Sequence, residues 1–257
     1  MNVSGDHFLG EARFHDRYFR GEIHPKSWFE KWVLSLYPAM PDAIDKLLRT
    51  LGQTSGKYIC EIGCGGGELT YALAARGARV SAIDISEEAV RLAQNRNREF
   101  TAGQVNVQLM DACDLRYNNG TFDMVAGAAI LHHLDLKKAG PELSRVLKQG
   151  GKAVFIEPLA YNPVSNLWRR LSPSIRTETE NPLAYSDILE VAKNFSSVAW
   201  QEYALLTLLS SFVFLLTHNY KAKVRSAQYL GRFEPAFLRI CKPLRRYSGA
   251  ILIEFTK

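Results

Sequence analysis

The sequence predicts an α/β fold with a mostly parallel β-sheet. The first observation is the stretch 58–70, where an apolar run leads into a glycine-rich turn and then into apolar residues at helical spacing. The second is that further short apolar runs alternate with helical segments, as they do in sheets covered by helices on both faces. The third is length, because 257 residues suffice for one such domain with insertions.

Composition excludes several classes of protein. Apolar residues make up 47% of the chain and charged residues 23%, which is typical of a globular protein. The first dozen residues lack an apolar core, so no signal peptide is expected. The cysteines are Cys60, Cys64, Cys113 and Cys241. Because none forms a CxxC pair, we expect reduced thiols in a cytoplasmic protein and no metal site.

Positive charge is concentrated near the end of the chain. The net charge is +6, and residues 219–257 hold nine lysines and arginines against two glutamates, a local charge of +7. A solvated helical face would explain this bias, and so would contact with an anionic partner.

The glycine turn is the strongest functional signal. Gly63, Gly65 and Gly67 permit positive φ angles, and a strand, a glycine turn and a helix N-terminus together present N–H groups to a ligand. The dinucleotide fingerprint needs G-x-G-x-x-G, but Glu68 occupies its third glycine position. The carboxylate of Glu61, just before the turn, would repel a pyrophosphate and attract a cationic ligand.

An acidic residue, any residue, then G-x-G-x-G is the first motif of the class I S-adenosylmethionine-dependent methyltransferases, and the chain resembles their small-molecule type from about residue 57 to 158. The resemblance implies a Rossmann-like, seven-stranded, mostly parallel sheet of order 3-2-1-4-5-7-6. The last strand is antiparallel, N-terminal helices precede the sheet, and a helical lid is inserted near the C-terminus. S-adenosyl-L-methionine would be the cofactor. The turn residues implied to bind it are Glu61, Gly63, Cys64, Gly65 and Gly67.

Residues 1–55 are expected to form an N-terminal helical cap, followed by a methyltransferase domain over 56–257 with insertions at about 158–184 and 204–247. Aromatic and aliphatic side chains recur at helical spacing in the cap, a pattern that more often marks a core than a site. In the family that the chain resembles, such helices commonly cover the cofactor. The candidates for that contact are Tyr18, Trp28 and Tyr37.

Acidic residues follow the second and third expected strands. Asp84 ends the strand at 78–83, about 20 residues past the glycine turn, where an acidic residue meets ribose hydroxyls in nucleotide folds. Ile85 would then lie against the adenine face. Asp111 ends the strand at 105–110, and the resemblance implies that it receives the adenine amino group. The backbone of Ala112 and Cys113 would border the ring.

The segment after the fourth strand, 122–127, has the sequence L-H-H-L that the family often shows. By resemblance, the backbone of Gly127 and Ala128 meets the amino group of the cofactor. His132 would face the substrate and accept a proton, although a structural role is equally open, and His133 would fix the loop. The N/D-P-P-Y motif of many nucleic-acid and protein N-methyltransferases is absent here. Nucleic acid is therefore not an expected partner.

Glu157 ends the fifth strand, and strand C-termini line the ligand crevice of open α/β sheets. It could orient an acceptor, take its proton, cap a helix or form a salt bridge. With His132 and His133 it completes the set of catalytic candidates. The insertion that follows carries Trp168, Arg169, Arg170 and Arg176, which could cover the crevice.

The uncharged run 204–216 precedes a basic amphipathic segment, 217–246, and a final strand, 250–255. The run is shorter than the roughly 20 apolar residues of a spanning helix. It would form either a lid helix or an interfacial helix that makes peripheral membrane contact through 204–246.

These observations predict methyl transfer to an oxygen or nitrogen of a small-molecule or lipid-like acceptor by in-line displacement. The alternatives are a dinucleotide-dependent oxidoreductase and a non-catalytic cofactor-binding module.

Overall fold

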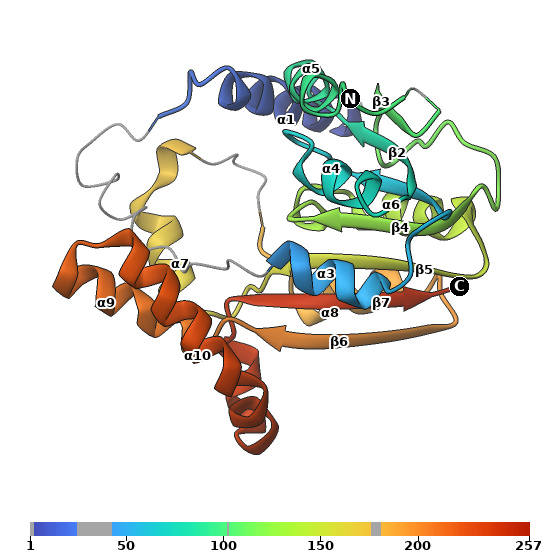
Figure 1. The fold of residues 1–257 in the computed structure, drawn as a ribbon. Helices are drawn as coiled ribbons and strands as arrows, with labels where there is room; N and C mark the ends of the chain where they lie inside the picture. Colours follow the sequence, from blue (N-terminus) through green and yellow to red (C-terminus); the bar gives the residue numbers. More distant parts are fainter. Residues whose placement is uncertain (1–2, 25–42, 102, 176–180) are drawn as a thin grey trace.

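The computed structural model describes residues 3–24, 43–101, 103–175 and 181–257, and Figure 1 shows their arrangement. The sheet has seven strands in the order β3-β2-β1-β4-β5-β7-β6, as predicted. Strand β7 runs antiparallel to both neighbours, and the other pairings are parallel. The strands are β1 (Tyr58–Ile62), β2 (Arg79–Asp84), β3 (Val105–Leu109), β4 (Phe122–Ala128), β5 (Leu147–Pro158), β6 (Ser197–Tyr203) and β7 (Ala250–Thr256).

Helices cover both faces of the sheet because its central strands are apolar on both sides. The helices α3 (Ala43–Leu51), α4 (Glu68–Ala74) and α5 (Glu87–Arg96) contribute to the core on one face. The helices α6 (Leu136–Val146) and α8 (Tyr185–Ala192) contribute to the core on the other. Although the sequence assigned α3 to the cap, its Leu47, Leu48 and Leu51 are buried in the same core as the strands.

The N-terminal helix α1 (Val3–Phe19) lies beside α5 (Figure 1). The carboxylate Oδ1 of Asp16 accepts hydrogen bonds from the Ser86 hydroxyl at 2.6 Å and the Glu88 backbone N–H at 3.1 Å. Asp16 thus satisfies an N–H in the first turn of α5, as a capping side chain does. This contact fixes α1 next to the end of β2.

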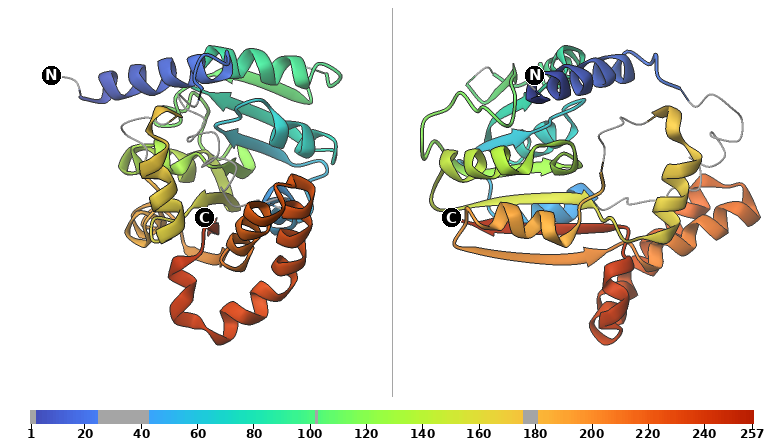
Figure 2. Two further views of the ribbon diagram at one scale, coloured as in Figure 1. Left: turned by 90° about the vertical axis from the view of Figure 1, so that its left-hand side faces the viewer. Right: turned by 180° about the vertical axis from the view of Figure 1, so that it is seen from behind.

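The remaining α-helices of the described residues lie beyond one end of the sheet, as the two views of Figure 2 show. They are α7 (Pro163–Leu171), α9 (Ser210–Thr217) and α10 (Tyr220–Ile240). The run 204–216 forms a short 3-10 helix, Leu206–Leu209, followed by α9, rather than one helix. The buried carboxylate of Glu234 on α10 accepts the N–H groups of Ala204 and Leu206, so α10 is joined to the end of β6.

None of the helices in the described ranges is both long enough and apolar enough to cross a membrane.

Candidate active site

A cavity of about 540 Å³ lies where β1, β2, β3 and β4 end, and α1 covers it. This is within the size range of small-molecule and cofactor sites, about 300–1,000 Å³. The lining residues shared with the sequence prediction are Gly63, Gly65, Asp84, Ile85, Asp111, Ala112, Cys113, Ala128 and His133. The carboxyl ends of adjacent parallel strands therefore bring most of the predicted residues together.

The glycine turn after β1 has the geometry that the spacing predicted. Gly63 and Gly65 have φ angles of 67° and 48°. A Cβ atom on Gly63 would lie 2.6 Å from Cδ1 of Ile130, so a larger residue would clash. Cys64 and Gly67 are not among the cavity-lining residues described. The N–H of Cys64 donates to Ile83, and Gly67 begins α4, so both shape the turn from behind.

Asp84 is held by two backbone hydrogen bonds. Its carboxylate accepts the N–H of Gly65 at 2.8 Å and the N–H of Ser86 at 2.9 Å. Burial raises the pKa of Asp84, and the hydrogen bonds from Ser86 and Gly65 oppose that shift. The carboxylate therefore has a fixed position at the end of β2, facing the cavity.

Glu61 does not line the cavity in the described structure. It is 2% exposed and accepts a hydrogen bond from the Thr70 hydroxyl at 2.5 Å. Burial, together with the neighbouring Asp84, raises the pKa of Glu61 to about 8, although the hydrogen bond from Thr70 opposes the shift. The structure thus places this predicted cofactor contact behind the glycine turn.

The ends of β3 and β4 complete the cavity wall. Asp111 accepts the N–H of Cys113 at 2.8 Å, which fixes the loop after β3. Ala128 lines the cavity, whereas Gly127 does not, because Ile130 and Phe155 pack within 2.9 Å of where its Cβ would be. Ala129 has a φ angle of 55°, an uncommon value for a residue with a side chain.

Glu157 and His132 pair with each other away from the cavity. The buried Glu157 carboxylate accepts the N–H groups of Ile130 and Leu131, each at 2.9 Å, and contacts Nδ1 of His132 at 2.7 Å. Neither residue is among those that line the cavity. Both residues thus make the structural contacts that the sequence left open as the alternative to facing the substrate, because the loop after β4 needs acceptors for its buried N–H groups.

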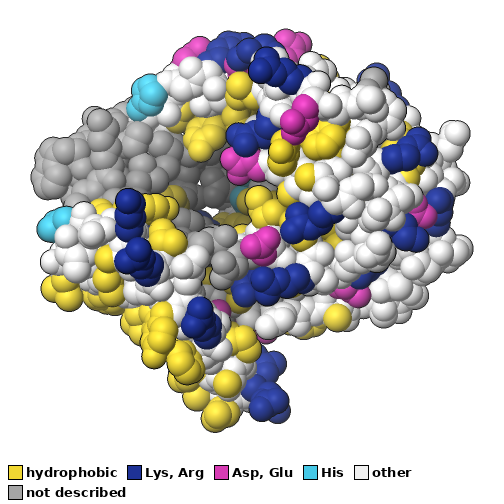
Figure 3. All heavy atoms as spheres, in the orientation of Figure 1, with side chains coloured by type: hydrophobic (Ala, Val, Ile, Leu, Met, Phe, Trp, Pro, Cys, Tyr) yellow, Lys and Arg dark blue, Asp and Glu magenta, His cyan; other side chains and the backbone are white. Residues whose placement is uncertain are grey.

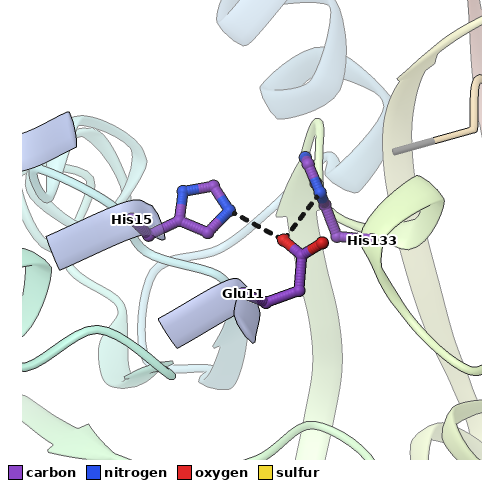
Figure 4. A group of neighbouring side chains, drawn as sticks. All are labelled: Glu11, His15 and His133. Atoms are coloured by element: carbon purple, nitrogen blue, oxygen red, sulfur yellow. Dashed lines mark ion pairs between the residues drawn. The ribbon is translucent and has the colours of Figure 1, made fainter. Parts of the chain in front are cut away.

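His133 lies in the position that the sequence gave to His132. It lines the cavity, and its Nδ1 is 3.3 Å from Oε2 of Glu11 on α1. The same oxygen is 3.3 Å from Nε2 of His15, as Figure 4 shows. Burial lowers the pKa of His133, although Glu11 opposes that shift.

Sequence reasoning missed the contribution of α1. Glu11, His15 and Phe19 all line the cavity, and their spacing of four residues places them on one helical face. This spacing was the sequence feature from which the contribution of α1 could have been predicted. Tyr18 is half exposed, and the other two predicted cap contacts, Trp28 and Tyr37, lie outside the described residues.

Arg176 of the insertion also lies outside the described residues. Trp168, Arg169 and Arg170 belong to α7 and are not among the described cavity-lining residues.

The cavity is acidic. Its lining carries the carboxylates of Glu11, Asp84, Asp111 and Asp135 but one lysine, Lys138, among the described residues. Such an excess of carboxylates favours a cationic ligand over an anionic one.

Comparisons with known proteins agree with this architecture. The family described as a methyltransferase domain matches residues 60–155. The chain is 33% identical to O-methyltransferase cnsE of Penicillium expansum over 126 residues, which are 46% of each chain. It is also 33% identical to a ubiquinone biosynthesis O-methyltransferase of Alkalilimnicola ehrlichii over 139 residues, or 52% of this chain and 54% of that one. The chain thus spans about half the length of these curated relatives.

Solved structures share the fold. Geranyl diphosphate C-methyltransferase from Streptomyces coelicolor has a TM-score of 0.58 at 21% identity, covering 83% of this chain and 76% of that one. Phosphoethanolamine N-methyltransferase 2 of Haemonchus contortus has a TM-score of 0.60 at 18% identity, and the match covers 93% of this chain and 60% of that one. The fold is that of the class I methyltransferases. Residues 60–155, which span β1 to β5, are the part of the chain that matches the methyltransferase domain family.

Proposed function

We propose that the protein binds S-adenosyl-L-methionine in the cavity under α1 and transfers its methyl group to an oxygen or nitrogen of a small-molecule or lipid-like acceptor. The observation that carries the proposal is one acidic cavity that joins the glycine turn, Asp84, Asp111 and Ala128. Two solved structures with this fold hold S-adenosyl-L-homocysteine or S-adenosyl-L-methionine, and both curated relatives described above are O-methyltransferases, one of them in ubiquinone biosynthesis.

The lining residues fit this cofactor. Asp84 has a fixed carboxylate that can accept hydrogen bonds from two ribose hydroxyls. Ile85 and Met110 offer apolar surface for the adenine, beside Asp111 as an acceptor for its amino group. The backbone at Gly63 and Ala128 would contact the methionine part of the cofactor. Glu61 lies behind the turn with a raised pKa in the cofactor-free protein, and a bound sulfonium would favour its ionised form.

When bound, the cofactor supplies a methyl group on a positively charged sulfur. The protein then needs chiefly to align the acceptor with that carbon and to exclude water, and alignment can account for about 7–11 kcal/mol of the barrier. We assign His133, whose ring lines the cavity, as the candidate acceptor of a proton from the substrate. Glu157 and His132 are assigned as positioning residues, because they hold the loop that carries His133.

The helices beyond the sheet indicate an amphiphilic acceptor. Figure 3 shows hydrophobic side chains gathered at the lower left of the molecule, where Figure 1 places α9 and α10. The exposed apolar residues there include Phe212, Leu216, Tyr220, Tyr229, Phe233 and Ile240. Exposed basic residues on and after α10 include Lys221, Arg225, Arg232, Arg239, Lys242 and Arg246. Apolar side chains beside basic ones are the composition of a surface that binds anionic membranes peripherally.

Calorimetry tests the cofactor. S-adenosylhomocysteine should bind at one equivalent, and NAD should not bind. Binding of NAD instead would favour the dinucleotide-dependent oxidoreductase. Incubating a cell extract with the protein and an isotopically labelled methyl donor should then produce a labelled small molecule or lipid in the mass spectrum. Cofactor binding without any labelled product would favour a non-catalytic module.

Liposome co-sedimentation tests the membrane contact. The protein should sediment with anionic vesicles at low salt, and Phe212→Ser with Leu216→Ser should weaken this binding. Val164→Ser with Leu167→Ser, on the exposed side of α7, is a matched control for loss of apolar surface. Absence of binding to anionic vesicles at low salt would remove the membrane part of the proposal.

A further inference from the structure

Three potential metal ligands converge at the inner face of α1. Glu11 and His15 are one helical turn apart, and His133 approaches them from the loop after β4. Figure 4 shows both imidazole rings next to the Glu11 carboxylate. One ligand atom from each residue lies within 4.8 Å of the other two, and the ring centroids of His15 and His133 are 5.2 Å apart.

The distances match those expected around a shared cation. Both nitrogen-to-oxygen distances are 3.3 Å, slightly longer than the usual range for a hydrogen bond, about 2.7–3.2 Å. Two atoms that each lie about 2.1 Å from one metal ion, at tetrahedral to octahedral angles, are about 3.0–3.4 Å apart. A cation could therefore bind between these groups with small side-chain movements.

Burial and charge favour a cation at this point. The side chains of Glu11, His133 and His15 are 4%, 14% and 24% exposed, so solvent competes little for the ligand atoms. Asp84 and Asp111 line the same cavity and add negative charge. All three ligands also face the cavity, so an ion held by them would keep open coordination positions on that side.

We propose that Glu11, His15 and His133 form a binding site for a divalent first-row transition-metal ion, with zinc as the first candidate. Two imidazoles and one carboxylate are a donor set that favours zinc and its neighbours, whereas calcium and magnesium prefer oxygen ligands alone. The alternative is a clamp of polar contacts that only fixes α1. The sequence predicted no metal site because it contains no CxxC pair, but a site of two histidines and one glutamate needs none.

The ion would also define the acceptor, and this part rests on the proposed function. An oxygen atom of the acceptor could occupy an open position on the ion. A hydroxyl bound to a divalent cation loses its proton more readily, here to water, and the ion fixes its orientation. With the ion bound, His133 would serve as a ligand, and this role would replace its role as the acceptor of the substrate proton. The acceptor class indicated is therefore a phenol, enol or similar hydroxyl compound.

The test uses the full chain, stripped with a chelator and then titrated with zinc in a calorimeter. We expect one equivalent to bind, and metal analysis after desalting should find one zinc per chain. Glu11→Gln, His15→Gln and His133→Gln should each weaken binding at least tenfold. His24→Gln, at an exposed histidine outside the cluster, is the matched control and should bind zinc as the parent does.

Cobalt gives a second readout that does not depend on turnover. Its visible spectrum should show nitrogen and oxygen ligands without the thiolate absorption that binding at Cys113 would produce. Each variant is first checked for folding by its melting temperature. The proposal is overturned if zinc does not bind to the parent chain, if the three variants bind it normally, or if thiolate absorption appears.

Titration of the chelator-treated protein with S-adenosylhomocysteine separates this proposal from the proposed function. Cofactor binding without zinc binding would refute the metal site and leave methyl transfer in place. Zinc binding without cofactor binding would support the metal site and refute the proposed methyl transfer.

Discussion

Replacing Glu157 tests whether this residue positions the site or takes part in the chemistry. Its buried carboxylate accepts the N–H groups of Ile130 and Leu131 and pairs with His132. We expect Glu157→Ala to destabilise the protein strongly, because it leaves two buried N–H groups and one imidazole nitrogen without their acceptor. Activity should fall through displacement of the loop that carries His133.

The magnitude follows from the number of bonds. Hydrogen bonds to a charged group contribute about 1.5–3 kcal/mol each, so three of them give about 4.5–9 kcal/mol. Burying the Glu157 carboxylate opposes this gain, so we take the lower end, about 4.5 kcal/mol. For a chain of this size, each kcal/mol changes the melting temperature by about 2–4 °C, so Glu157→Ala should melt roughly 10 °C lower. Glu157→Gln keeps an oxygen for the N–H groups and should lose about half as much.

Thermal and urea denaturation, combined with methyl-transfer assays, distinguish the two roles. Glu190→Ala is the control, because its ion pair with Lys193 lies on a partly exposed helix surface and should contribute less than about 1 kcal/mol. A Glu157→Gln variant of unchanged stability that has lost all activity would refute the positioning role. Such a result would mean that the carboxylate acts on the acceptor itself.

Three further predictions concern α1 and the cofactor residues. Asp16→Ala should destabilise the protein by about 1 kcal/mol, measured by urea denaturation, and should also weaken S-adenosylhomocysteine binding, because α1 loses its contact with α5. Asp84→Asn should weaken that binding at least tenfold in calorimetry, about 1.4 kcal/mol, whereas Asp123→Asn, at the opposite end of the sheet, should not. Burial raises the pKa of Glu61 from 4.5 to about 8, so its contribution to the stability of the cofactor-free protein is lost as the pH rises through 8. Glu61→Gln should remove this part of the pH dependence in urea denaturation, and an unchanged pH profile would contradict the assignment.

The sheet was predictable because each of its signals is local. An apolar run followed by Gly63-x-Gly65-x-Gly67 defines a strand, a turn and a helix whatever surrounds them. Asp84 and Asp111 end neighbouring parallel strands, so their meeting at one edge of the sheet followed from topology. The strand order itself came from the family resemblance.

Which of the two histidines lines the cavity could not be predicted from local signals. His132 and His133 are adjacent in sequence, and which of them enters the cavity depends on the short helical turn formed by 131–133. That turn in turn depends on a carboxylate from another strand, Glu157, which accepts the N–H groups at its start. Glu11 was missed because an acidic residue on a helix is usually solvated, and its burial depends on how α1 docks.

Ser86 connects the end of β2 with α1. Its backbone N–H donates to Asp84 and its hydroxyl donates to Asp16, so one residue contacts both the proposed nucleoside end of the cavity and the helix that covers it. Because such coupling is reciprocal, whatever tightens the closed helix must tighten nucleoside binding by the same factor. A nucleoside bound at Asp84 and α1 docked at Asp16 would therefore stabilise each other through one serine.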